Sequence, residues 1–127
     1  MMNSKRGKII SHGVVLQPHE REIAQLLIER GFIIELIPTA RQHHRKTADA
    51  IIKGIEWEFK TLRGHTTQSI ERLLKKAHKQ SSNIVIDIRH TRLREAQAIA
   101  KIKYEFRKRS AIKRIKIISK SKGIIDL

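Results

Sequence analysis

A chain of 127 residues is long enough to bury one core, and this one contains no cysteine. The lack of cysteine excludes a disulfide framework, thiolate zinc sites and cysteine nucleophiles. Lysine and arginine outnumber aspartate and glutamate by 28 to 12, which gives a formal net charge of +16 and predicts a polyanionic partner. Nucleic acid is favoured because neutralised backbone phosphates release counterions, and an anionic membrane surface is the rival.

The N-terminal stretch is polar and basic, and we expect it to be loose up to about Lys8. Ile9 and Ile10 then begin a short extended lead-in. No apolar run reaches transmembrane length, and the first residues lack the long apolar segment of a secretory signal. The sequence therefore predicts a protein that is not inserted in a membrane.

The first helix is predicted from Pro18 to Arg30, because proline suits the first turn, apolar residues recur at helical spacing, and Gly31 follows as a stop. Glu20 falls on or beside the buried face of this helix. A carboxylate in that place has two interpretations. It either stabilises the positive end of the helix dipole or takes part in catalysis.

A strand is predicted next, from Phe32 to Ile37, and a polar basic loop follows it at residues 39–47. The loop contains His43 and His44, but adjacent histidines without a third nearby ligand are weak grounds for a zinc site. We expect the loop instead to contact nucleic-acid phosphates through its cations, which are Arg41, Arg45 and Lys46.

The segment from Asp49 to Lys60 reads as two short strands joined by a tight turn at Lys53-Gly54. Apolar and polar residues alternate in the second strand, so Glu56, Glu58 and Lys60 share one face, and the hairpin brings Asp49 close to Glu58. Two such carboxylates can hold Mg²⁺ or Mn²⁺, and Lys60 would then orient the attacking water or stabilise developing charge. The pattern alone has low specificity, because an amphipathic surface strand in a Lys- and Glu-rich chain reads the same way.

The second half of the chain continues the alternation of helices and strands. A helix is predicted from Thr67 to Gln80, with cations on its exposed side at Arg72, Lys75, Lys76 and Lys79. Ile84 to Ile88 is the most β-branched run and the expected central strand, within which Asp87 is expected to pair with Arg89 or with a neighbouring lysine. A helix from Thr91 to Lys108 and a terminal hairpin, Ile112 to Ile118 with Ile124 to Leu127, complete one α/β domain with a mixed sheet flanked by helices.

The order helix, strand, Asp strand, Glu-x-Lys strand, helix, strand resembles the core of the PD-(D/E)xK nuclease superfamily. More narrowly, the chain from about Glu20 to Asp126 is similar to the C-terminal tRNase toxin domain of the CdiA contact-dependent growth inhibition proteins and their phage and mobile-element relatives. That similarity rests on short motifs in a fixed order, which are Trp57-Glu58-Phe59-Lys60-Thr61 with Gly64, Ser69-Ile70-Glu71, Ala77, Gln80-Ser81, Asn83-Ile84-Val85-Ile86-Asp87 and Lys122-Gly123-Ile124-Ile125-Asp126.

The resemblance implies a metal-dependent endoribonuclease that acts on tRNA, with DNA as the other polymer to consider, and a cognate immunity protein as a partner. It implies action in a bacterial cytoplasm, which would be that of the target cell if the domain is delivered as a toxin. The site residues that agree with it are Asp49 and Glu58 as metal ligands, Glu20 as an accessory acid, Lys60 as an electrostatic catalyst and Gln80 as a positioning residue. As a further cation, Arg63 is expected to contact the substrate backbone together with the loop cations.

Two other function classes fit the same residues. One is a metal-independent RNase of the barnase, colicin or RelE-like kind, in which His65, His43 and Arg63 replace the ion. The other is a non-catalytic nucleic-acid-binding module, in which the Glu-x-Lys strand is only a solvated face. Activity that survives EDTA would indicate the first, and salt-dependent binding without cleavage would indicate the second.

Overall fold

The computed structural model describes residues 6–38 and 47–127 as three helices and seven strands. In chain order these elements are β1 (Lys8–Ile10), α1 (Pro18–Glu29), β2 (Ile33–Leu36), β3 (Ala50–Ile52), β4 (Ile55–Thr61), α2 (Thr67–Ala77), β5 (Asn83–Asp87), α3 (Glu95–Lys108), β6 (Arg114–Ile118) and β7 (Ile124–Asp126). The predicted order of elements and the mixed α/β class are confirmed. The strand β1 is an addition, since the sequence predicted only an extended lead-in there.

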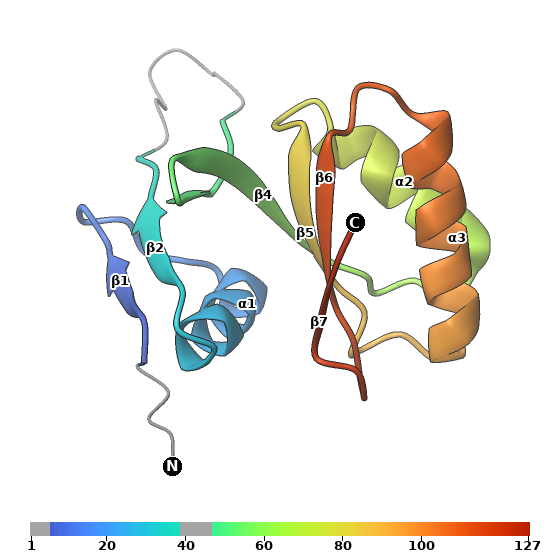
Figure 1. Ribbon diagram of the computed structural model, residues 1–127, viewed down its shortest axis with the longest axis horizontal. Helices are drawn as coiled ribbons and strands as arrows, with labels where there is room; N and C mark the ends of the chain where they lie inside the picture. The colour runs from blue at the N-terminus through green and yellow to red at the C-terminus, as the bar shows by residue number, and fades with distance from the viewer. Residues whose placement is uncertain (1–5, 39–46) are drawn as a thin grey trace.

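One mixed sheet joins the described strands, and their order across the sheet is their order along the chain. The pairs β1–β2, β4–β5 and β5–β6 are parallel, while β2–β3, β3–β4 and β6–β7 are antiparallel. The seven-residue strand β4 runs between the half of the sheet that carries α1 and the half that carries α2 and α3 (Figure 1). The middle strand of the sheet is therefore β4, which contains Glu58 and Lys60, and the predicted central strand β5 lies next to it.

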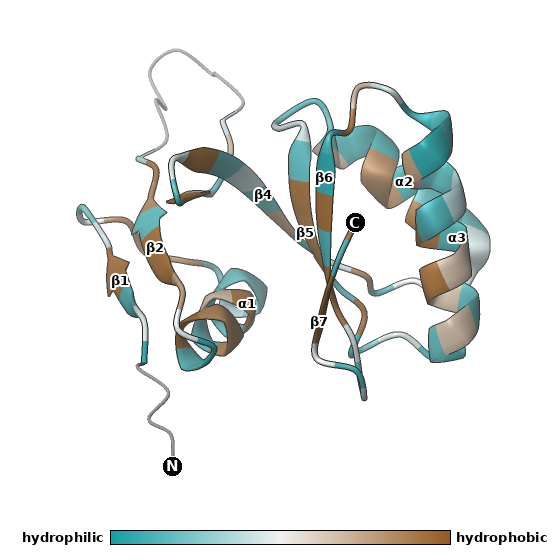
Figure 2. Ribbon diagram, viewed as in Figure 1, coloured by the Kyte–Doolittle hydropathy of each residue, from teal (hydrophilic) through white to brown (hydrophobic). Residues whose placement is uncertain are grey.

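The helices cover opposite faces of the sheet, as alternate residues of β5 demonstrate. Val85 belongs to the same apolar core as Leu27 of α1, whereas Ile84 and Ile86 belong to the core that includes Leu74 of α2 and residues of α3. Successive side chains of a strand point to opposite faces, so the two apolar cores lie on the two sides of the sheet. Figure 2 shows the apolar colour gathered in β5 and β6 and along α1.

The β3–β4 hairpin forms as predicted, since both turn residues have positive φ. Lys53 has φ 52° and Gly54 has φ 78°, which is the left-handed pair that a two-residue hairpin turn requires. Glycine at the second position adopts this conformation without a steric penalty. The turn fixes the register Ala50↔Trp57, and this register decides which side chains meet at the start of β3.

Two helix ends differ from the prediction because side chains and turns compete with the helical backbone. α2 ends at Ala77, and residues 78–80 form a turn in which the Gln80 N–H donates to the Ala77 carbonyl at 2.9 Å. α3 begins at Glu95 and not at Thr91, because the Thr91 hydroxyl donates to the Gly64 carbonyl at 2.7 Å and accepts from the Leu93 N–H at 3.2 Å. Within the described residues, no helix has the length and apolar character needed to cross a membrane.

Candidate active site

The β3–β4 hairpin sets Asp49 beside Glu58. Asp49 directly precedes Ala50, which pairs with Trp57 across the hairpin, and the Asp49 N–H donates to the Trp57 carbonyl at 3.0 Å. The Phe59 N–H donates to Asp49 Oδ2 at 2.8 Å, so the carboxylate is oriented by the backbone of β4. The proximity of Asp49 and Glu58 that the alternating pattern predicted is therefore present.

Two more of the predicted site residues join this pair. Lys60 Nζ lies 3.3 Å from Glu58 Oε2 on the same face of β4. Glu20, in the first turn of α1, accepts from the Gln17 N–H at 2.9 Å and lines with Asp49 a cavity of about 520 Å³. Glu20 thus closes the first turn of its helix and also lies close enough for its charge to act on Asp49. We refer to Glu20, Asp49 and Glu58 as the carboxylate cluster.

Burial and mutual repulsion raise the pKa of both central carboxyl groups. Glu58 is 2% exposed, and burial together with the charge of Asp49 raises its pKa to about 8, although Lys60 opposes the shift. Burial raises the pKa of Asp49 to about 6, with a further increase from the charge of Glu20 and a decrease from the Phe59 N–H. Without a bound cation both groups therefore keep their protons to a higher pH than free carboxyl groups do.

The two central carboxylates of the cluster, Asp49 and Glu58, have the chemistry to hold a hard divalent cation. Glu58 Oε1 is buried and has no hydrogen-bond partner among the residues that the structure describes. A buried oxygen of this kind destabilises the protein by about 1–3 kcal/mol unless a proton or a cation reaches it. Carboxylate oxygens are the ligands that Mg²⁺ and Mn²⁺ prefer, and a cation would relieve the repulsion that raises both pKa values.

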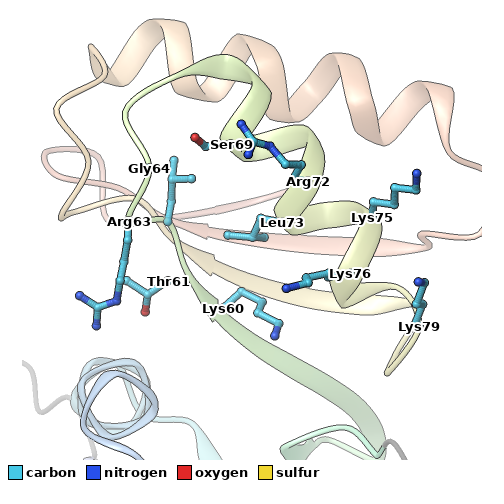
Figure 3. A pocket seen from close by; sticks show the side chains of 11 residues that line it. Lys60, Thr61, Arg63, Gly64, Ser69, Arg72, Leu73, Lys75, Lys76 and Lys79 are labelled. Atoms are coloured by element: carbon cyan, nitrogen blue, oxygen red, sulfur yellow. The ribbon is translucent and has the colours of Figure 1, made fainter.

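A basic groove adjoins the cluster between β4 and α2. It encloses about 480 Å³, and its lining includes no acidic residue. The side chains of Lys60 and Lys76 extend into the same space from the two elements (Figure 3). We use the name basic groove for the surface formed by the six cations that line it, which are Lys60, Arg63, Arg72, Lys75, Lys76 and Lys79.

The cations that α2 and the turn after it add to the basic groove were predicted only to be exposed, with no role in binding. Their positions 72, 75, 76 and 79 follow the i, i+3, i+4, i+7 spacing of a single helical face, and this signal was available in the sequence. What the sequence could not supply is the position of that face opposite Lys60. Arg63, predicted as a contact to the substrate backbone, lies on the loop at the end of the groove.

Within the part of the chain that the structure describes, the predicted positioning residue Gln80 does not contact the carboxylate cluster through a hydrogen bond. Gln80 is half-buried in the turn after α2, and no hydrogen bond joins its side chain to the carboxylate cluster within the described chain. The next residues attach that turn to β4, because the Ser81 hydroxyl and the Asn83 amide both donate to the Glu56 carbonyl at 3.0 Å.

His65, a candidate for the metal-independent mechanism, accepts the Arg92 N–H at 3.1 Å. Outside the described residues lie Arg41, His43, His44, Arg45 and Lys46.

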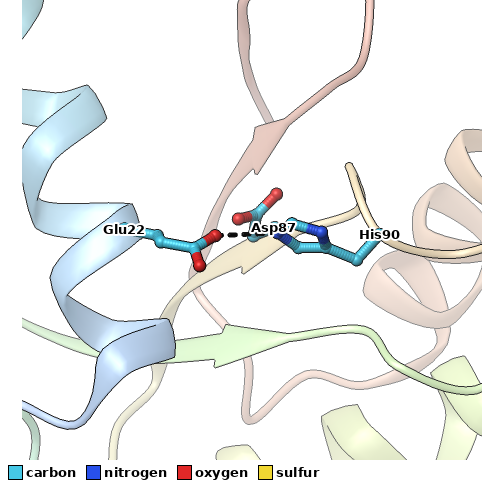
Figure 4. A group of neighbouring side chains, drawn as sticks. All are labelled: Glu22, Asp87 and His90. Carbon is cyan, nitrogen blue, oxygen red and sulfur yellow. Dashed lines mark hydrogen bonds and ion pairs between the residues drawn. The ribbon is translucent and has the colours of Figure 1, made fainter.

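A second group of possible ligands lies at the end of β5 (Figure 4). One ligand atom from each of Glu22, Asp87 and His90 lies within 4.8 Å of the others. Both oxygens of the buried Asp87 are already bound, because Arg89 Nη2 donates to Oδ2 at 2.8 Å and Arg89 Nε donates to Oδ1 at 2.9 Å. His90 Nε2 lies 2.9 Å from Glu22. The predicted pair of Asp87 with Arg89 is confirmed, and the group ties α1 to the loop after β5.

Comparison with known proteins agrees with this fold. The solved structure described as the CdiA-CT/CdiI toxin and immunity complex from Burkholderia pseudomallei is similar, with a TM-score of 0.73 and 18% identity over 95% of this chain and 98% of that chain. No curated protein sequence matches. The model of the family described as the contact-dependent growth inhibition CdiA C-terminal domain matches residues 46–124, well over half of the sequence. The resemblance to the CdiA C-terminal domain is therefore confirmed, and the chain belongs to the CdiA C-terminal domain family.

Proposed function

We propose that this domain is a metal-dependent endoribonuclease toxin, with tRNA as its favoured substrate and DNA as the competing polymer. The observation that carries the proposal is Glu58, a buried carboxylate with an unpartnered Oε1 among the described residues, beside Asp49 and 3.3 Å from Lys60 Nζ. This arrangement supports cation binding next to a groove that attracts phosphates. The formal net charge of +16 supports a nucleic-acid substrate.

Each residue of the site has a separate role in the proposal. Asp49 and Glu58 would hold the cation, which when bound would polarise a phosphoryl oxygen and lower the pKa of a water molecule. The Lys60 side chain is 30% exposed, so its ammonium can reach a phosphate and neutralise the negative charge that develops during cleavage. The Phe59 N–H keeps Asp49 in position, Glu20 is the accessory acid, and Gln80 is a positioning residue.

Membership of the family supports the toxin role. The similar structure from Burkholderia pseudomallei is described as a complex of a toxin with an immunity protein. We propose that this domain likewise has a cognate immunity protein, and that it acts in the cytoplasm of a target bacterium, where RNA substrates are present.

Dependence on a divalent cation is the first test. Purified protein incubated with total tRNA is expected to release fragments in Mg²⁺ but none in excess EDTA, and added Mg²⁺ should restore cleavage, because charge relief at the cluster requires the cation. Asp49→Ala and Lys60→Ala should each lower the cleavage rate by about 10²–10³-fold. Gel electrophoresis of the products measures both. Glu56→Gln is the matched control, since Glu56 lies on the same strand and is exposed.

Three results would redirect the proposal. Cleavage that survives EDTA would contradict the metal assignment and favour the metal-independent mechanism through His65 and Arg63. Steeply salt-dependent RNA binding without cleavage would favour a binding module. Faster cleavage of duplex DNA than of tRNA under the same conditions would move the substrate assignment to DNA.

A further inference from the structure

We propose that the basic groove binds the backbone phosphates of a base-paired RNA segment and holds that segment against the carboxylate cluster. The inference rests on the proposed nuclease function, and it adds the surface that binds the substrate and the form of RNA that this surface fits. It is carried by the arrangement of cations in the groove, by the position of Lys60 and by the absence of aromatic residues from the lining.

The groove presents its cations in a regular row. Residues 72 and 79 are separated by seven positions of α2 and the following turn, which corresponds to about 10 Å along a helix axis. A row of this length can face several successive phosphates of one nucleic-acid strand. Since no acidic residue lines the groove, none of these cations is neutralised by another lining residue.

Lys60 connects the groove to the carboxylate cluster. It lines the groove together with Lys76, and its Nζ lies 3.3 Å from Glu58 Oε2. A phosphate held by Lys60 in the groove therefore lies next to the residue that contacts the cluster. This contact favours a polymer that is cut at the cluster over a partner that merely covers the groove.

The lining favours base-paired RNA over unpaired RNA. Single-stranded nucleic acid is usually held by stacking its bases on aromatic side chains, whereas a duplex is recognised through its shape, phosphates and 2′-hydroxyls. The chain contains three Phe, one Trp and one Tyr, and none of them lines the groove. The large exposed aromatic residue of the described chain, Tyr104, lies on α3 between Lys101 and Lys108.

The test is the binding of a labelled RNA hairpin to the full chain, followed by fluorescence anisotropy in EDTA over a range of salt concentrations. The variant K75Q/K76Q/K79Q is expected to bind at least about tenfold more weakly at 0.1 M salt, and the slope of log affinity against log salt should fall by about 1 for each lost contact. The control variant K103Q/R107Q/K113Q removes the same charge from exposed positions elsewhere and should keep the slope. In cleavage assays the α2 variant should raise KM much more than it lowers kcat.

The outcomes separate this inference from the proposed function. If the wild-type protein cleaves RNA and the α2 variant binds the hairpin normally, the role of the basic groove is contradicted and the nuclease function still stands. If the wild-type protein does not cleave RNA and the α2 variant binds the hairpin more weakly, the nuclease function is contradicted and the role of the basic groove in RNA binding still stands. Tighter binding of an unstructured RNA of equal length contradicts the base-paired substrate. Equal affinity for polyglutamate and for the hairpin would assign the groove to an acidic protein surface instead.

Discussion

Glu58→Gln is expected to lower phosphodiester cleavage by about 10²–10³-fold and, at pH 8, to raise the free energy of unfolding of the metal-free protein. The two effects have one cause. Glutamine keeps the shape of the buried side chain but removes the charge that would hold the cation, and that same charge is repelled by Asp49 when no cation is bound. A residue that served only the fold would not combine loss of activity with gain of stability.

The direction of the stability change follows from how the free energy of unfolding depends on pH. Glu58 has an ordinary pKa of 4.5 when unperturbed and about 8 in the fold, so between these values the folded protein binds more protons than the unfolded chain. The free energy of unfolding of the metal-free protein must therefore fall as pH rises through this interval, with a slope that approaches about 1.4 kcal/mol per pH unit for one proton. Asp49, raised to about 6, adds a fall of the same sign at lower pH.

Urea unfolding in EDTA at pH 5.5, 7 and 8.5 measures this effect. The wild-type protein should lose stability across the series, and Glu58→Gln should lose markedly less. Glu56→Gln is the control, and it should follow the wild-type curve because Glu56 is exposed. Parallel curves for wild type and Glu58→Gln would show that Glu58 is not the buried titrating group. Mg²⁺ at pH 8.5 should stabilise the wild-type protein more than the Glu58→Gln variant.

Arg89→Ala is expected to destabilise the protein by about 3–5 kcal/mol, the usual effect of removing one partner of a buried ion pair. Asp87 is fully buried at the end of β5, and Arg89 supplies three hydrogen bonds to it, two from the guanidinium and one from the backbone N–H at 3.0 Å. Alanine keeps the backbone bond but removes the charge that compensates the carboxylate. The buried Asp87 would then lack a counter-ion.

The neighbouring residue provides the control for Arg89. His90→Ala removes a partly exposed contact with Glu22 and should change the free energy of unfolding by no more than about 1 kcal/mol. Urea denaturation of both variants at pH 7 distinguishes the two cases. Equal effects of the two substitutions would contradict the assignment of Asp87 and Arg89 as the pair that stabilises this end of the sheet.

Local sequence was sufficient to predict the hairpin and the Asp87 pair. The turn at Lys53-Gly54 and the alternation after it fixed the register that sets Asp49 beside Glu58, and both residues lie within ten positions of one another. Arg89 follows Asp87 by two positions at the end of a strand, so their contact also depends on local geometry. Such features are encoded by neighbouring residues and need no knowledge of the rest of the fold.

Contacts between distant segments could not be predicted in this way. The approach of Glu20 to Asp49 depends on how α1 packs against the sheet, and periodicity alone left its role open. The same holds for Glu22 and His90, which are 68 positions apart, and for the position of the α2 cations opposite Lys60. The predicted start of α3 was wrong for a related reason, because the hydroxyl of Thr91 donates a hydrogen bond to Gly64, in a loop that is distant in sequence.

The order of the strands has a consequence for how the domain reaches its folded state. The antiparallel neighbours β2–β3, β3–β4 and β6–β7 are joined without an intervening helix, whereas each parallel pair has a helix between its strands. Shorter loops cost less entropy to close, so we expect the antiparallel pairs to form before the parallel ones. The hairpin that carries Asp49 and Glu58 is the shortest of these loops. The two central residues of the site are thus brought together by one of the earliest folding events.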